Sequence, residues 1–226
     1  EHSVRFWCAT EDKLLPVVYA PNESKTSVVE SDLKPLYPPV EGFIVETAED
    51  KVVQGWKISD KGENVPGNIL GSMVHKAIQR WLFPGNPNLI ALLEAESIRA
   101  GLVTESSRLN AVRCASELLT RLHSHPLWEE INSTQVRHSE VPFMIGVEGG
   151  TEHGVIDLLY REAHGWQLID FKTDTVTTNA RKQELIQTYA KQVQHYKAAA
   201  ESTLGQSVHA RICFLDCLGK VELVEI

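Results

Sequence analysis

The chain of 226 residues is long enough for one large domain, and its composition is ordinarily globular, with 42% hydrophobic and 23% charged residues. This composition excludes wholesale disorder, and no apolar run approaches the roughly 20 residues that cross a bilayer. The net charge of −8 argues against a surface that binds phosphate everywhere, although a local basic groove is compatible with it. We expect a cytoplasmic protein, because the chain shows no basic and apolar leader.

Residues 1–60 show no strong periodicity and are interrupted by prolines. We expect a connecting arm here, with a short strand near Gly42–Val45. An N-terminal lobe packed on the main domain is an equally good interpretation. The chain begins at Glu1 without a methionine, which leads us to expect a fragment of a longer protein.

Regular patterns begin near Pro66. Apolar residues at helical spacing, together with Thr104 as a helix cap and Pro126 as a stop, predict three successive helices. Alternating or continuous apolar runs then predict strands on either side of one long helix. The expected helices cover residues 69–82, 88–100, 104–125 and 179–202, and the expected strands cover 135–147, 154–161, 166–172, 208–215 and 220–226. This order predicts one α/β domain over residues 61–226.

Two of the expected strands carry acidic residues and a lysine among apolar neighbours. If they form a hairpin centred between Ala163 and His164, Asp157 lies directly opposite Asp170. Side chains alternate along a strand, so both aspartates and Lys172 then share one face. The residues of the other face are expected in the hydrophobic core. They are Ile156, Leu158, Tyr160, Ile169 and Phe171.

Two like charges placed opposite each other weaken a hairpin, and an isolated carboxylate is costly to bury. Lys172 can neutralise only one of the two aspartates. A divalent cation between Asp157 and Asp170 satisfies both, and oxygen ligands favour Mg²⁺ or Mn²⁺. A lysine beside such an ion can orient or deprotonate a water molecule. The alternative interpretation is a solvated salt-bridge cluster on the surface.

These residues belong to five short motifs whose types and order along the chain resemble those of the PD-(D/E)XK nucleases, in the RecB/AddA branch. The motifs lie within roughly residues 65–226 and read Gly71-Ser-Met-Val-His75, Glu140-Val-Pro-Phe143, Gly154-Val-Ile-Asp157, Ile169-Asp170-Phe171-Lys172-Thr173 and Gln192-Val-Gln-His-Tyr196. The resemblance implies an α/β fold with a restriction-endonuclease-like core (αβββαβ), in which helices flank a central mixed sheet.

The resemblance also implies roles for single residues. Asp157 and Asp170 correspond to metal-binding carboxylates, and Lys172 corresponds to the catalytic lysine. The backbone carbonyl of Phe171 faces the ion, and His75 corresponds to a further metal ligand that a helix supplies. A histidine beside an apolar helix stripe is the alternative interpretation of His75.

Three further residues are expected to support the site. Glu140 lies upstream of Asp157 and is followed by Pro142 and Phe143. The alternative interpretation of Glu140 is a strand residue that faces solvent. Gln192 and Tyr196 lie at i and i+4, so they share one helix face. The resemblance implies that this pair orients Lys172 or contacts a DNA phosphate, whereas a core tyrosine beside an incidental glutamine is the alternative.

The region around the long helix carries more basic than acidic residues, which suits a phosphate backbone. A solvated helix face would give the same pattern. The residues from which we expect DNA contacts are Arg181, Lys182, Tyr189 and Lys191.

The four cysteines lack the closely spaced set found in family members with an iron–sulfur cluster, so we expect no such cluster. The resemblance then implies the cluster-free type, in which the nuclease is the C-terminal domain of a helicase–nuclease. A helicase domain in the same parent chain, a partner subunit, and a role in double-strand break repair and recombination at the bacterial nucleoid follow from the resemblance alone.

The expected activity is Mg²⁺- or Mn²⁺-dependent hydrolysis of DNA phosphodiesters, exonucleolytic rather than endonucleolytic, on single strands that a helicase supplies. Two alternatives remain open. The first is a nuclease-fold module that binds DNA or a partner without cutting. The second is a free-standing exonuclease that resembles the phage recombination type.

Overall fold

The computed structural model describes residues 65–147 and 150–226, so the expected arm and the strand near residues 42–45 lie outside the described residues. The division of the chain at residue 61 stays a prediction. The elements, in chain order, are α1 (Gly67–Gln79), α2 (Asn88–Arg99), α3 (Glu105–His123), α4 (Pro126–Asn132), β1 (Arg137–Val147), β2 (Gly150–Glu162), β3 (Gly165–Val176), α5 (Asn179–Leu204), β4 (Val208–Cys217) and β5 (Lys220–Glu225).

The described strands form one five-stranded mixed sheet in the order β1-β2-β3-β4-β5. Strands β1, β2 and β3 pair antiparallel, β3 and β4 pair parallel, and β5 returns antiparallel to β4. Parallel neighbours need a crossover connection, and α5 supplies it between β3 and β4. The expected α/β fold with helices around a central mixed sheet is therefore confirmed.

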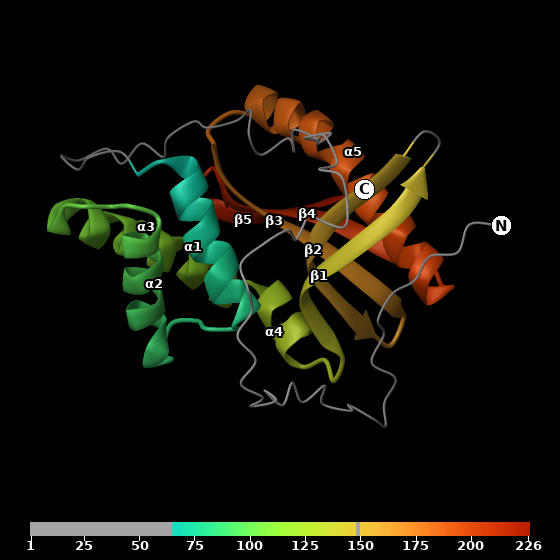
Figure 1. Ribbon diagram of the computed structural model, residues 1–226, viewed down its shortest axis with the longest axis horizontal. Coiled ribbons are helices and arrows are strands. Elements are labelled where there is room, and N and C mark those ends of the chain that lie inside the picture. The colour runs from blue at the N-terminus through green and yellow to red at the C-terminus, as the bar shows by residue number, and fades with distance from the viewer. Residues whose placement is uncertain (1–64, 148–149) are drawn as a thin grey trace, which may run out of the picture.

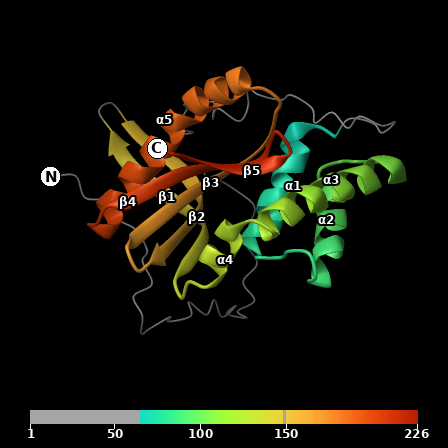
Figure 2. The ribbon, with the colours of Figure 1, turned by 180° about the vertical axis from the view of Figure 1, so that it is seen from behind.

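The two faces of the sheet are covered by different helices. Leu158, Tyr160 and Phe171 belong to one buried cluster with residues of α1–α4. Leu159 and Leu168 belong to a second buried cluster with residues of α5. In Figures 1 and 2, α5 runs along one side of the sheet, while α1, α2 and α3 gather beyond one end of it.

The helix ends follow the local sequence. The Thr104 hydroxyl accepts a hydrogen bond from the Ser107 amide at 3.1 Å, which caps α3 as expected. Helix α4 was not predicted, although Pro126 at its first position and the His125 ring that accepts from the Leu127 amide are start signals. In the ranges described, no helix combines the length and apolar character of a membrane span.

The hairpin register was predicted correctly up to the site and departs from the prediction there. Pairing of β2 with β3 runs from Glu162 opposite Gly165 to Leu158 opposite Ile169 and then stops. The expected core face was wrong for Ile156, which packs on the α5 side rather than with Leu158. The alternation of side chains therefore breaks at Asp157.

Candidate active site

The first feature of the site is a histidine that joins helix α1 to strands β2 and β3. His75 Nε2 lies 3.0 Å from the carbonyl oxygen of Phe171, and its Nδ1 lies 3.2 Å from Asp157 Oδ1. One turn earlier, Gly71 lets the helix approach β3 closely, because a Cβ there would lie 3.3 Å from Thr173 Oγ1. The Gly-x-x-x-His spacing thus brings the imidazole onto the sheet.

Glu140 completes a compact group of donors with His75 and Asp157. One ligand atom from each of the three residues lies within 4.8 Å of the other two. Glu140 stands in β1 between Ser139, which pairs with Leu158, and Val141, which pairs with Ile156, so it lies opposite Asp157. Its φ of +52° is rare for a side chain with a Cβ, and such strain is typical of functional sites. The group is called the His75–Glu140–Asp157 cluster below.

Asp170 and Lys172 form a buried ion pair beside this cluster. They are 2% and 4% exposed, and Lys172 Nζ lies 3.1 Å from Asp170 Oδ2. Lys172 opposes the rise that burial causes in the pKa of Asp170, so the ammonium is the charge partner of this buried carboxylate. A buried carboxylate needs such a positively charged partner.

Helix α5 holds the Lys172 ammonium from the other side. Gln192 Oε1 lies 3.3 Å from Lys172 Nζ, and the Gln192 amide donates to the Tyr196 hydroxyl at 2.6 Å. The ammonium also stands 4.3 Å from the centre of the Tyr189 ring, which is a cation–π contact. The expected i, i+4 pair of Gln192 and Tyr196 is thus placed where it can orient the lysine.

Asp157 and Asp170 have different contacts, and the regular pairing of β2 with β3 stops one residue pair before them, so their direct opposition on one shared face stays a prediction. Asp157 contacts His75 of α1, whereas Asp170 contacts Lys172, which lies against α5. The Asp157 Oδ2 atom accepts the Phe171 amide hydrogen at 2.7 Å, in place of a backbone carbonyl. The regular backbone pairing of β2 and β3 ends at this point, and the Asp157 side chain binds the β3 backbone instead.

The protonation states follow from burial and from these contacts. Burial alone lowers the pKa of His75, but the charge and hydrogen bond of Asp157 outweigh it and raise the pKa to about 9. Burial favours a higher pKa for Asp157, but His75, Lys172 and the Phe171 amide hold it below its usual value. Burial and the charge of Asp157 raise the pKa of Asp170 to about 6, against the opposing effect of Lys172.

The residues expected to contact DNA lie in different environments. Tyr189 is 3% exposed, and its hydroxyl donates to Asp174 Oδ2 at 2.9 Å, so it packs beneath Lys172 rather than on a DNA-facing surface. Arg181 pairs with Glu184 at 2.8 Å and Lys182 pairs with Glu222. Lys191 is exposed on α5.

Asp174 is a site residue that the sequence reasoning did not select. Burial raises its pKa, although the hydrogen bond from Tyr189 acts in the opposite direction. Its position two residues after Lys172, and four after Asp170, was the available signal, since residues at this spacing share one strand face. It anchors the tyrosine ring that lies under the lysine.

The donors of the His75–Glu140–Asp157 cluster fit a divalent cation. The carboxylates of Glu140 and Asp157 are oxygen donors, which suit Mg²⁺, Ca²⁺ or Mn²⁺, and the Phe171 carbonyl lies 3.0 Å from His75 Nε2. Protonated His75 bridges the oxygens of Asp157 and Phe171, so it supplies the positive charge that an ion would bring to the same two oxygens.

The chain is similar in sequence to proteins that share one name. A protein of Carboxydothermus hydrogenoformans, named as one subunit of an ATP-dependent helicase/nuclease, is 28% identical over 207 residues, which cover 84% of this chain and 17% of the relative. The protein of the same name from Heliobacterium modesticaldum is 29% identical over 154 residues, which cover 57% of this chain and 11% of the relative. The chain therefore spans less than a fifth of the length of these relatives.

A crystal structure of a provisionally named exonuclease from Eubacterium rectale overlaps 76% of this chain and 61% of its own, with a TM-score of 0.49 and 11% identity. That likeness is too distant to support an argument about the site. The description of the PD-(D/E)XK nuclease superfamily, in contrast, matches residues 52–224, which are most of the chain. The chain therefore belongs to the PD-(D/E)XK nuclease superfamily.

Proposed function

We propose that the chain is a Mg²⁺-dependent deoxyribonuclease that hydrolyses phosphodiester bonds. The observation that carries the proposal is the buried Asp170–Lys172 ion pair beside the His75–Glu140–Asp157 cluster. Here a buried lysine lies next to three acidic side chains and a histidine. Apolar residues in place of a buried ion pair often stabilise a protein as well or better, so stability alone does not explain this group. The arrangement does meet the needs of phosphate chemistry.

Each residue has a defined task in this proposal. His75, Glu140, Asp157 and the Phe171 carbonyl hold the cation, and Asp170 joins them through Oδ2. When bound, the cation supplies positive charge that offsets the charge of the phosphate in the transition state. Lys172 positions the attacking water and takes part in its deprotonation. Gln192 and the Tyr189 ring fix the ammonium, so that little reorganisation is needed during the reaction.

The biological setting is proposed from the relatives. Both relatives described above are named as subunits of an ATP-dependent helicase/nuclease, and this chain corresponds to a small part of each. We propose that the parent protein carries a helicase domain and binds a partner subunit. The nuclease would then cut single strands supplied by the helicase, as an exonuclease in double-strand break repair and recombination at the bacterial nucleoid.

The experiment compares the native chain with Asp170→Asn and Lys172→Met, two variants of nearly unchanged side-chain volume. Labelled single-stranded DNA is incubated with each protein over a Mg²⁺ titration, and folding is checked by circular dichroism. We expect metal-dependent products from the native chain and a loss of at least about 100-fold in both folded variants. A module that only binds DNA would give no product with any of the three proteins, and that result would overturn the proposal.

A further inference from the structure

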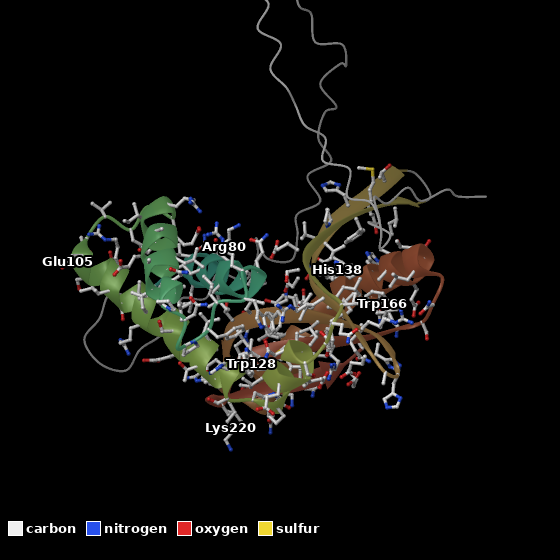
Figure 3. All side chains as sticks on the ribbon, turned by 90° about the horizontal axis from the view of Figure 1, so that it is seen from below. Arg80, Glu105, Trp128, His138, Trp166 and Lys220 are labelled. Atoms are coloured by element: carbon white, nitrogen blue, oxygen red, sulfur yellow. The ribbon has the colours of Figure 1, made fainter. Side chains whose placement is uncertain are left out.

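The β1–β2 ribbon continues beyond the site and has two unlike faces. One face packs against α5: the Phe143 and Tyr196 rings meet with centroids 5.3 Å apart, and Glu152 lies 3.2 Å from His195. The ribbon itself bends away from α1–α4 (Figure 3). Its second face is therefore turned away from α5 and is not covered by the helices at the end of the sheet.

This second face is exposed and largely apolar. Met144 is 63% exposed and Val155 is 41% exposed. Met144 pairs with His153 across the ribbon, and Pro142 pairs with Val155, so the four side chains form one continuous surface. We call Pro142, Met144, His153 and Val155 the outer ledge.

The outer ledge is continuous with the proposed metal site. Pro142 follows Glu140 by two residues, and Val155 precedes Asp157 by two residues. Pro142 and Val155 thus lie about 6.6 Å along the strand from Glu140 and Asp157. A DNA strand whose phosphate lies at the His75–Glu140–Asp157 cluster therefore has its neighbouring nucleotides within reach of the outer ledge.

The chemistry of the outer ledge favours bases over phosphates. Residues 141–156 contain no lysine or arginine, so the ribbon offers no strong grip on a negative backbone. Apolar side chains and a histidine ring instead suit the faces of unpaired bases, which stack on such surfaces in proteins that bind single strands. In a duplex these faces are already stacked and covered.

We propose that the outer ledge is a base-stacking platform for the single-stranded DNA that enters the proposed nuclease site. The inference rests on the proposed function and adds the position and the kind of substrate contact. It assigns substrate binding to residues that take no part in metal binding or in proton transfer. It also gives the site a physical reason to prefer unpaired nucleotides.

The test measures binding by fluorescence anisotropy without metal, so that it does not depend on cleavage. The probes are a labelled single strand and the same strand with its bases removed as abasic sites. We expect Met144→Ala combined with His153→Ala to weaken binding of the normal strand about tenfold, and Met144→Phe to retain it. The affinity for the abasic strand should be low, and it should be the same for the native chain and for every variant. Leu109→Ala, which alters an exposed leucine on α3, should leave every value unchanged.

Equal losses on the normal and abasic strands, or no loss on either, would overturn the base-stacking role. A change in oligomeric state of the double variant on gel filtration would identify the ledge as a protein interface and would also overturn it. If the native chain binds the normal strand better than the abasic one but never cleaves it with Mg²⁺, the proposed function fails while the ledge stands. The two failures are therefore distinguishable.

Discussion

The imidazole of His75 and the carboxylate of Asp157 form an ion pair, with Nδ1 and Oδ1 3.2 Å apart. Because the pKa of His75 is raised to about 9, the ring carries a proton on each nitrogen at neutral pH when no cation is bound. A metal ligand must be unprotonated, so a cation can use His75 only after it has displaced a proton. In the proposed metal site, protonation of His75 and its binding to a cation would therefore exclude each other.

Metal affinity should accordingly rise with pH. Between pH 6.5 and 9, we expect the association constant for Mn²⁺ to increase by up to about tenfold per pH unit, because one proton is released for each ion bound. Isothermal titration calorimetry in buffers of different ionisation enthalpy measures both the affinity and the number of protons. In His75→Gln the slope should disappear. A native affinity that is flat over this range would contradict the assignment of His75.

The stability of the metal-free protein, unlike its metal affinity, should fall as the pH rises. The pKa of His75 is about 9 in the folded protein, above the ordinary value of 6.5 that applies to the unfolded chain. Protonated His75 therefore contributes up to about 3 kcal/mol to the free energy of unfolding. This contribution is fully present below pH 6.5 and is lost as the pH rises toward 9. Urea unfolding in EDTA at a series of pH values measures it, and His75→Gln should lose less stability over the same range.

The sequence was sufficient for the local parts of this fold and insufficient for the site geometry. The register between β2 and β3 could be predicted, because apolar alternation and the turn at Gly165, with its φ of +129°, are both local signals. The Asp170–Lys172 pair followed from the same alternation. The end of the regular pairing at Asp157 could not be predicted, since the bond from the Phe171 amide to its side chain is not a local signal.

The site residues of the helices likewise depend on tertiary contacts, which local sequence signals do not reveal. The position of His75 was available only from the family resemblance, because the approach of α1 to β3 is a tertiary contact. Tyr189 was expected to contact DNA together with the basic residues of the same helix. Its burial depends on the way α5 lies on the sheet and on Asp174, neither of which is a local property.

Gly154 packs closely against Phe143 of β1 and Tyr196 of α5. A Cβ at this position would lie 2.7 Å from Phe143 Cε1 and 3.2 Å from Tyr196 Cε1. Gly154→Ala should therefore displace two rings and destabilise the protein by about 1–3 kcal/mol. Thermal unfolding measures the effect. Gly146→Ala is the matched control, because nothing lies within 4 Å of a Cβ there, and a similar loss in both variants would contradict the packing argument.

The contact between Gln192 and Lys172 should affect turnover more than binding. Gln192→Ala removes the acceptor 3.3 Å from the ammonium while leaving the Asp170 ion pair intact. We expect kcat to fall about tenfold with KM nearly unchanged, since the lysine loses orientation rather than charge. Steady-state cleavage of labelled DNA gives both constants. Gln194→Ala, exposed on the same helix, is the control, and an unaltered kcat in Gln192→Ala would show that α5 does not orient the lysine.

The most direct measurement is a crystal of the chain soaked in Mn²⁺ near pH 8.5 and examined by anomalous scattering. We predict one strong peak between Glu140 and Asp157, within about 2.0–2.3 Å of a carboxylate oxygen of each, and the His75 ring released from at least one of its present contacts. A peak elsewhere, or none at a concentration of Mn²⁺ at which the same protein cuts DNA, would contradict the assignment of this site.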